Sequence, residues 1–484
     1  MEIDTSIDIN IEEKYNKLIY WFKEISKVPR NSTQEEKIAD YLCDFAKKRN
    51  LEYRKDDLYN VLIKKKASEG YEEKNPIMLQ AHTDMVCEKT SESNHDFTKD
   101  QIEIIENSEI LTAKDTTLGA DDGIGVATLL LLLDDEEIKH PDIYCLFTTQ
   151  EEIGMDGAKY FDYSGIDAKY LINVDGEEEN TAIVGCAGGV RLQYEKNVEL
   201  ESIREENKIY EIKISGLHGG HSGVDIDKGR LNSNYLVAQI LQKIEDNMLI
   251  YFKGGNKDNA IPNETVAIFS SKLEKNDIEH IISSITDKLN IVEEDKNLKI
   301  DFNEKINFNK SISNEESKSV IDLIINLKQG VIEYSKDKEG LVETSGNIGI
   351  VEIDNGKIKI TELIRSSDDN KKEDVKNYNN KLVGEFGYMF SENSSYPGWK
   401  YKPNSNIEKQ YIESYKEVHS GVEPIVCAIH AGVECGMIYK KMPQLEMISI
   451  GPDLVDVHTV NETLYLNSCK KYLETLLRLI VKLG

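Results

Sequence analysis

The sequence predicts an α/β fold with a mostly parallel central sheet, into which a separate α+β domain is inserted. Over residues 1–186, short apolar strands alternate with amphipathic helices, a pattern typical of parallel sheets covered by helices. Between residues 187 and 397 the segments instead alternate apolar and polar side chains, as half-buried antiparallel strands do. The length of 484 residues suits two or three domains of roughly 100–200 residues each.

The elements of the first domain follow from local patterns. The earliest is an amphipathic helix, and a second begins after Asn31, Ser32 and Thr33, residue types that favour helix N-termini. Apolar runs predict strands, and apolar residues at helical spacing predict a final helix that packs on the sheet. The expected helices cover residues 13–29, 34–49, 125–134 and 464–483, and the expected strands cover 60–64, 76–82, 142–148 and 170–175.

The inserted domain begins after residue 186 and returns to the first domain through a linker. A strand is expected over residues 208–214, and helices over 232–245 and 276–289. Residues 391–405 contain two prolines and a glycine, which predicts the return linker. The predicted division is therefore 1–186 and 398–484 for the first domain and 187–397 for the inserted domain.

Composition limits the partners and the compartment. The chain carries 59 basic and 88 acidic residues, for a net charge of −29, which argues against nucleic acid and anionic membranes as partners. The N-terminus lacks a basic region followed by an apolar core, and the longest apolar run, residues 126–133, is too short to span a bilayer. Seven scattered cysteines without a CxxC pair indicate reduced thiols, so we expect a cytoplasmic protein.

Polar residues that can bind a cation follow several predicted strands. In open α/β sheets, binding sites form beyond the carboxyl ends of the strands. His82 and Asp84 lie two positions apart, which places both side chains on one face of an extended chain. A carboxylate beside a ligating imidazole fixes its tautomer and raises its basicity. Asp121 lies among glycines that allow tight turns, and its two carboxylate oxygens can bridge two cations.

Four more candidates complete the set. Glu151 and Glu152 follow the strand at 142–148, Asp175 ends the next strand, and His458 lies near the other end of the chain. Adjacent carboxylates repel one another unless a cation or proton intervenes, so one can bind metal while the other acts as a general base. Each residue alone is more simply a helix cap or a solvated surface group. Together they suit two divalent ions, with zinc first and cobalt or manganese as alternatives.

The motifs in order resemble the aminoacyl-histidine (Xaa-His, carnosinase-like) dipeptidases. This family belongs to the clan of co-catalytic di-zinc exopeptidases and deacylases that includes carboxypeptidase G and peptidase T. The resemblance covers residues 13–484 and is specific as a combination. Its motifs are HTDMV at 82–86, GADDGIG at 119–125, QEEIGMDGA at 150–158, NVDGEE at 173–178, GLHGGHSGVDI at 216–226, HAGVECG at 430–436 and GPDLVDVH at 451–458.

The resemblance implies a di-zinc exopeptidase domain and roles for its residues. His82 and Asp175 would bind one metal, Glu152 and His458 the other, and Asp121 would bridge the two. Asp84 would orient His82. Glu151 would be the general base that takes a proton from a metal-bridging water, so that the resulting hydroxide attacks the scissile carbonyl of a dipeptide, with broad specificity allowed.

The inserted domain would be the lid of that family, with four residues that contact a small peptide substrate. His221 would contact the tetrahedral intermediate, Asn259 the substrate, and Arg365 the C-terminal carboxylate, while the backbone near Gly432 would line the pocket. For His221 the simpler reading is a turn residue among glycines. For Arg365 it is a surface ion pair, and the two readings are equally weighted.

Two other functions stay open at this point. One is an N-acyl amino acid deacylase of the same clan, although HAGVECG and the long insert favour the dipeptidase. The other is a non-catalytic, metal-dependent binding protein, for which we would expect a missing ligand or base, and the motifs lack neither. The sequence also leaves open whether the chain acts as a monomer or as a homodimer.

Overall fold

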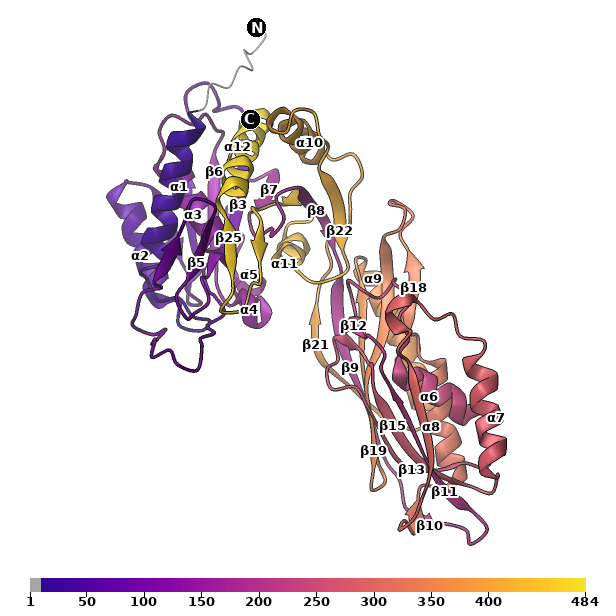
Figure 1. Ribbon diagram of the computed structural model, residues 1–484. Coiled ribbons are helices and arrows are strands. Elements are labelled where there is room, and N and C mark those ends of the chain that lie inside the picture. Colours follow the sequence, from indigo (N-terminus) through magenta and orange to yellow (C-terminus); the bar gives the residue numbers. More distant parts are fainter. Residues whose placement is uncertain (1–9) are drawn as a thin grey trace. The chain divides into compact units, whose positions relative to one another are not determined.

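The computed structural model describes residues 10–484, and these form two compact units (Figure 1). Unit 1 consists of the described residues up to Gly185 together with Tyr401–Ala428 and Val433–Gly484. Unit 2 consists of Cys186–Lys400 and Ile429–Gly432. The sequence-based division placed its boundaries after residues 186 and 397 and did not separate residues 429–432 from the first domain.

An eight-stranded sheet with the order β1-β2-β6-β3-β7-β23-β8-β22 forms the centre of unit 1. Its central strands, β6, β3, β7 and β23, pair in parallel. The pairs β1–β2, β2–β6 and β23–β8 are antiparallel. The strands are β1 (Glu52–Lys55), β2 (Val61–Lys65), β3 (Ile77–His82), β6 (Ile143–Thr148), β7 (Tyr170–Asn173), β8 (Thr181–Cys186), β22 (Ile425–Ile429) and β23 (Glu446–Ser449).

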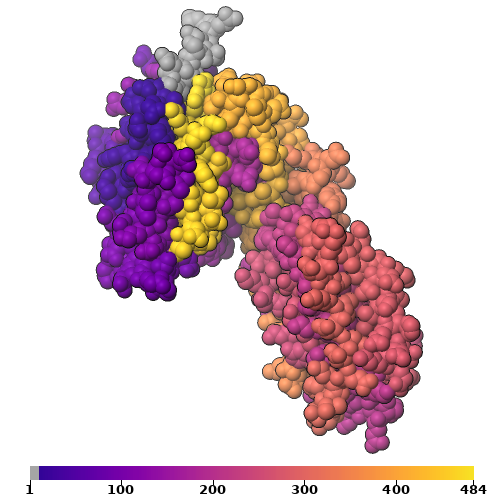
Figure 2. All heavy atoms as spheres, viewed as in Figure 1, coloured from indigo at the N-terminus to yellow at the C-terminus, as the bar shows by residue number. Residues whose placement is uncertain are grey.

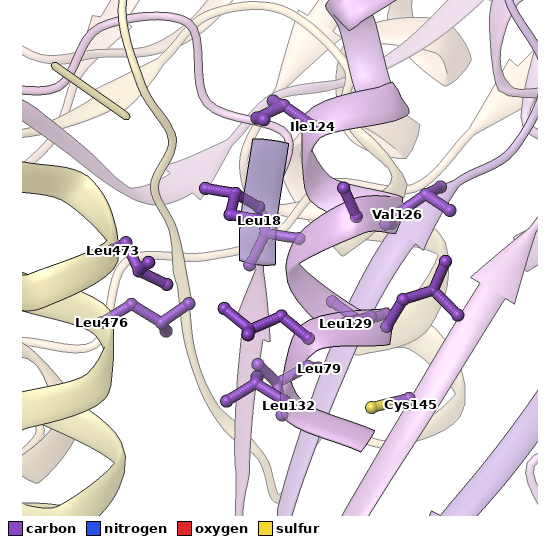
Figure 3. Close-up of a cluster of buried hydrophobic side chains, with 14 of the residues drawn as sticks. Leu18, Leu79, Ile124, Val126, Leu129, Leu132, Cys145, Leu473 and Leu476 are labelled. Atoms are coloured by element: carbon purple, nitrogen blue, oxygen red, sulfur yellow. The ribbon is translucent and has the colours of Figure 1, made fainter. Parts of the chain in front are cut away.

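Helices cover this sheet and share a core with it. The longer ones are α1 (Ile11–Ile25), α2 (Glu36–Lys48), α3 (Ala120–Asp134), α10 (Asn406–Val418) and α12 (Leu466–Leu483), and the shorter ones are α4 (Glu151–Gly154), α5 (Asp156–Tyr160) and α11 (Glu434–Lys441). Helix α3 is buried along nearly its whole length, which explains why its sequence is apolar on every side. Figure 3 shows Leu18 of α1, Leu129 and Leu132 of α3, and Leu473 and Leu476 of α12 in the same buried cluster.

The first and the last helix of the described chain pack together in unit 1. The final helix, expected over residues 464–483, is α12, and it packs against α1 and α10. In Figure 2 this segment (yellow) lies on the surface beside the N-terminal part of the chain (indigo to purple). Directly before α12 in the chain, β24 (Leu454–Val455) and β25 (Thr463–Tyr465) form a small antiparallel sheet with two strands from the first part of the chain, β5 (Ile110–Ala113) and β4 (Ile104–Glu106).

Unit 2 is built on a nine-stranded antiparallel sheet with helices on one face. The main path is β16-β11-β15-β13-β19-β20-β9-β21, and β18 pairs with β19. Side chains alternate along the strands, so one face packs on the helices while the other stays polar. The strands are β9 (Gly188–Asn197), β11 (Lys208–Ser215), β13 (Met248–Gly254), β15 (Thr265–Ser271), β16 (Lys299–Lys305), β18 (Gly330–Tyr334), β19 (Val342–Asp354), β20 (Lys357–Ser366) and β21 (Met389–Tyr396).

Four helices and several short elements complete unit 2. The helices are α6 (Ser233–Gln242), α7 (Lys275–Thr286), α8 (Asn314–Asn326) and α9 (Asp369–Glu385), and a 3₁₀ turn spans Glu293–Asp295. The short strands β12 (Gly220–His221) and β14 (Ala260–Ile261) pair with each other, as do β10 (Glu201–Ser202) and β17 (Lys310–Ser311).

The predicted linker at residues 391–405 is wrong in its first part. Residues 391–396 belong to β21, which pairs antiparallel with β9 at the edge of the sheet. The segment is rich in serine and asparagine, which are depleted in strands. An edge strand exposes one side to solvent and therefore tolerates such polar residues.

Two general features bear on the setting of the protein. Over residues 10–484, no helix has the length and apolar character needed to cross a membrane. All seven cysteines lie in this same range, and none of them forms a disulfide.

Candidate functional site

The carboxylate of Asp121 lies between two histidines in unit 1. His82 Nε2 is 2.9 Å from Asp121 Oδ1, and His458 Nε2 is 3.0 Å from Asp121 Oδ2. His82 ends β3, Asp121 is in the first turn of α3, and His458 is in the loop between β24 and β25. Three segments that are far apart in the sequence therefore meet on the two oxygens of one carboxylate.

Asp175 and Glu152 extend this arrangement on either side. Asp175 Oδ1 lies 3.4 Å from His82 Nε2, and Glu152 Oε2 lies 3.0 Å from His458 Nε2. The five predicted ligands thus fall into two groups that share Asp121, which is the grouping that the family resemblance implies. Each group contains one imidazole and two carboxylates.

The clustered carboxylates perturb one another. Burial, reinforced by Asp121, raises the pKa of Asp175 to about 6, and burial together with Asp121 and Asp175 raises that of Glu177 to about 7. Hydrogen bonds to Asp121 and Glu152 raise the pKa of His458 to about 10. Burial opposes the cation of His82, but Asp175 and Asp121 outweigh it and raise its pKa. The residues around Asp121 therefore favour a positive charge among them.

The donor set fits divalent metal ions. His82, Asp121 and Glu152 each offer one ligand atom, and these three atoms lie within 4.8 Å of one another. Glu152 Oε1 is buried and has no hydrogen-bond partner within residues 10–484. A buried carboxylate oxygen without a partner lowers the stability of the fold, and a bound cation would remove this cost. A mixed imidazole and carboxylate environment is typical of zinc, and of manganese or cobalt.

Asp84 contacts both His82 and the turn that carries Glu151 and Glu152. Its carboxylate accepts hydrogen bonds from the backbone N–H groups of Glu151 (3.1 Å) and Glu152 (3.3 Å) and from the hydroxyl of Ser32 (2.9 Å). His82 Nδ1 lies 3.1 Å from the backbone oxygen of Asp84 and 3.6 Å from its carboxylate. Asp84 therefore orients His82 chiefly through its main chain, and its side chain fixes the Glu151–Glu152 turn.

Glu151, the predicted general base, lies among other carboxylates. It begins α4, directly after Gln150, whose backbone is in the left-handed region at φ 57°. Burial raises the pKa of Glu151 well above its usual value, and the negative charges of Asp175 and Glu434 add to this effect. A carboxylate with a raised pKa can hold a proton at neutral pH and pass it on.

A second buried carboxylate, Glu434, lies beneath the strand ends. Gln80 Nε2 and the hydroxyl of Thr148 donate to Glu434 Oε2 at 2.5 and 2.9 Å, and Asn173 donates to Gln80 Oε1 at 2.7 Å. Burial raises the pKa of Glu434 to about 8. Glu434 thus joins β3 to β6, and Gln80 in turn joins β3 to β7, at the edge of the sheet that carries the predicted ligands.

Two buried charges that sequence reasoning missed hold the ligand-bearing loops. Glu462 accepts hydrogen bonds from the four consecutive backbone N–H groups of residues 118–121, at 2.7–3.2 Å. Arg30 donates to the backbone oxygens of Thr83 (3.1 Å), Asp84 (3.3 Å) and Gly119. Glu462 follows His458 by four residues, so it joins the His458 loop to the Asp121 turn, and Arg30 joins that turn to the end of β3.

The predicted substrate-binding residues lie in unit 2, where His221 and Arg365 form a pair of hydrogen-bond donors. His221 Nδ1 accepts hydrogen bonds from the N–H groups of Gly223 and Val224, both at 3.2 Å. In neutral His221 the proton must therefore be on Nε2. Burial and the neighbouring Arg365 lower the pKa of His221, which favours this neutral form. Nε2 faces Arg365 Nη2 at 3.4 Å, so two N–H donors converge and suit an oxygen acceptor.

Arg365 is buried and forms no salt bridge with any described residue. Arg365 is 4% exposed, its Nη1 donates to the Tyr396 hydroxyl at 2.8 Å, and its Nε has no hydrogen-bond partner among the described residues. His430 Nε2 lies 2.7 Å from the Ser345 hydroxyl, and burial lowers the pKa of His430 to about 3. A buried guanidinium whose partners are a hydroxyl and an imidazole suits an incoming anion.

Asn259 and Gly432 lie close to this pair. The backbone oxygen of Asn259 accepts from Ser222 N–H at 2.8 Å, and Ala260 is the strand partner of His221. Gly432 lies against the ring of Tyr396, since a Cβ there would come within 2.6 Å of Tyr396 Cε2. Unit 2 thus brings together Arg365, His221, Asn259 and Gly432, which the sequence places far apart.

Comparison with known proteins identifies the family. The family described as Peptidase family M20/M25/M40 matches residues 78–482 of the chain. The chain belongs to this peptidase family. Together with the dipeptidase relatives described next, this match confirms the predicted resemblance to aminoacyl-histidine dipeptidases and the predicted α/β fold.

Three proteins match nearly the whole length of this M20 peptidase. It is 34% identical over 465 residues to the cytosol non-specific dipeptidase of Escherichia coli (strain K12), covering 95% of this chain and 96% of that protein. The aminoacylhistidine dipeptidase from Vibrio alginolyticus has a TM-score of 0.93 and 31% identity over 96% of each chain. The aminopeptidase PepT from Bacillus cereus ATCC 10987 shares the fold, with a TM-score of 0.56 and 15% identity over 97% of this chain and 98% of that one.

These relatives also bear on the choice of function. A metallopeptidase of the exopeptidase type is supported by the family and by both dipeptidase relatives. They do not favour the deacylase alternative or the non-catalytic alternative.

Glu462 should be needed for metal binding by this M20 peptidase. Glu462→Gln replaces one carboxylate oxygen with an NH₂ group that faces backbone N–H donors, so the Asp121 turn loses part of its support. We expect the affinity for divalent metal to fall by about 10- to 100-fold. Titration against a competing chelator measures this.

Glu446→Gln is the matched control, because Glu446 also accepts a backbone N–H, that of Asn406, but in a segment without ligands. Its metal affinity should equal that of the unchanged protein. Equal affinities for the Glu462 and Glu446 variants would contradict the role of Glu462.

Proposed function

We propose that this chain is a dipeptidase that uses two divalent metal ions, zinc in the first place and cobalt or manganese as alternatives. The observation that carries this proposal is Asp121, whose two carboxylate oxygens each contact a different histidine. His82, Asp121 and Asp175 would hold one ion, and His458, Asp121 and Glu152 the other. When bound, such a pair polarises a carbonyl oxygen and lowers the pKa of water.

The residues of the chain then supply the proton transfers. Glu151 accepts a proton on its carboxylate from the attacking water and returns it to the nitrogen of the leaving amine. Asp84 holds the backbone N–H of Glu151 and orients His82 Nδ1 through its carbonyl, which keeps base and ligand in fixed positions. The fixed turn reduces the reorganisation needed during the reaction.

We further propose that unit 2 is the substrate-binding lid. Arg365 would bind the C-terminal carboxylate of the peptide, and His221 would donate a hydrogen bond from its Nε2–H group to the oxyanion. The converging donors Arg365 Nη2 and His221 Nε2 support this assignment. Asn259 and the backbone at Gly432 would contact the rest of the substrate. A guanidinium suits carboxylate recognition because its fork of donors matches the two oxygens.

The substrate class follows from the relatives and from Arg365. A relative named as a non-specific dipeptidase and another named as an aminoacylhistidine dipeptidase support small peptides with a free carboxylate, Xaa-His dipeptides among them. The name of the first relative and the absence of disulfides among the cysteines support a cytoplasmic setting.

Removal of metal should abolish dipeptide hydrolysis. We expect a chelator to eliminate turnover of an Xaa-His dipeptide, and we expect zinc, cobalt or manganese to restore it, with close to two ions bound per chain by elemental analysis. An N-acetyl amino acid should be a much poorer substrate in the same assay. Full activity after exhaustive chelation would contradict the proposal.

Substitution of the proposed base should separate turnover from metal binding. Glu151→Gln preserves shape but cannot accept the proton, so kcat for dipeptides should fall by about 10²- to 10⁴-fold. The bound metal should not change, which elemental analysis of the variant tests. Glu152→Gln is the contrasting variant and should lose both metal and activity. Unchanged kcat in Glu151→Gln would rule out its role as base.

Substitution of Arg365 should remove the preference for a free carboxylate. Arg365→Met deletes the charge-assisted hydrogen bonds, which are typically worth about 1.5–3 kcal/mol, so kcat/KM for a dipeptide should fall about 10- to 100-fold. The corresponding dipeptide amide should be little affected. Arg204→Met, at an exposed arginine in the same unit, is the control. Equal losses for acid and amide would contradict carboxylate recognition by Arg365.

A further inference from the structure

Four residues lie side by side across four strands of the unit 2 sheet. Ser345 of β19 pairs with Arg365 of β20, Arg365 pairs with Gly189 of β9, and Gly189 pairs with Tyr396 of β21. The hydrogen bond between Arg365 and Tyr396 places these two side chains on the same face. Gly189 therefore occupies the position between them, where any other residue would project a side chain.

The missing side chain at Gly189 allows Tyr396 to reach Arg365. Arg365 Nη1 donates to the Tyr396 hydroxyl at 2.8 Å, across the strand that carries Gly189. A Cβ at position 189 would lie 2.5 Å from both Cζ and the hydroxyl oxygen of Tyr396. Carbon atoms cannot approach so closely without displacement. A side chain at position 189 would therefore displace the ring of Tyr396 from its position beside Arg365.

A second glycine confines the same ring. A Cβ on Gly432 would lie 2.6 Å from Cε2 of Tyr396. Gly432 belongs to the short segment Ile429–Gly432 that joins unit 2, and His430 of this segment is fixed by the Ser345 hydroxyl. Backbone from two separate segments thus leaves a narrow slot for the ring of Tyr396.

This slot determines how the guanidinium of Arg365 is presented. Arg365 Nη1 donates a hydrogen bond to the Tyr396 hydroxyl, and Arg365 Nη2 faces His221 Nε2. A hydroxyl holds the guanidinium without neutralising its charge, whereas a carboxylate in the same position would compete with an incoming anion. The hydroxyl can also donate its own proton, because it accepts the one from Arg365.

We propose that Tyr396 is a positioning residue for substrate binding, which fixes the guanidinium of Arg365 through its hydroxyl, and that Gly189 and Gly432 form the slot that holds it. This inference rests on the proposed function, in which Arg365 binds the C-terminal carboxylate of the peptide. It adds a specificity role for residues of β9, β21 and the segment Ile429–Gly432, outside the residues assigned to the reaction itself.

The test compares a dipeptide with its amide in Tyr396→Phe. Loss of the hydroxyl should raise KM for the dipeptide by about tenfold and leave kcat close to unchanged, because Arg365 becomes mobile but the metal site does not change. KM for the dipeptide amide should not change. Tyr388→Phe is the matched control, since the hydroxyl of Tyr388 is buried in the same unit without a hydrogen-bond partner among the described residues.

Gly189→Ala tests the slot independently. It leaves both hydrogen-bonding groups in place but displaces the ring, so KM for the dipeptide should rise as in Tyr396→Phe. In a Tyr396→Ala background the ring is absent, and adding Gly189→Ala should then cause no further rise. Such non-additivity is expected only when two residues share one contact.

The outcomes separate this inference from the proposed function. If Arg365→Met abolishes the distinction between acid and amide but Tyr396→Phe and Gly189→Ala do not alter KM, the positioning role is overturned and the function stands. If Arg365→Met leaves that distinction intact, the assignment of Arg365 fails, and the role of Tyr396 fails with it. A fall in kcat for both substrates in Tyr396→Phe would indicate a structural role and would also overturn the inference.

Discussion

The burial of the Asp121 carboxylate between His82 and His458 is the interaction on which the rest of the site depends. Each of its oxygens serves a different histidine, so small shifts of any of three segments would break the arrangement. Further carboxylates gather around it, and their mutual repulsion and burial raise the pKa values of Asp175 and Glu177. Such a cluster is stable in a folded protein only when positive charge is close.

The fold meets this constraint by fixing the loops rather than the side chains alone. Glu462 accepts hydrogen bonds from four consecutive backbone N–H groups of the turn that carries Asp121. Arg30 joins the same turn to the end of β3 through hydrogen bonds to backbone oxygens. Asp84 fixes the Glu151–Glu152 turn in a similar way. Each of these buried charges is satisfied by backbone groups, which leaves the ligand side chains available for cations and for substrate.

In unit 2 the buried charge is that of Arg365, and side-chain groups hold it in place. Unit 2 holds the buried guanidinium of Arg365 with a tyrosine hydroxyl that reaches across a glycine in the neighbouring strand. The imidazole of His221 is held neutral, with its proton on Nε2, by two backbone N–H groups. Uncharged partners thus define the orientation of Arg365 while its positive charge remains free to attract an anion.

The sequence by itself determined the fold class, the family and the residue types at the proposed metal site, because strands, helices and short motifs such as HTDMV and GADDGIG are local patterns. It mistook β21 for a linker, since an edge strand tolerates the serines and asparagines of a loop. It also gave no role to Glu462, Arg30 or Tyr396. Glu462 contacts Leu118, 344 positions away, and Tyr396 meets Arg365 only through strand register. Contacts between distant segments arise from chain packing, so only the tertiary structure decided them.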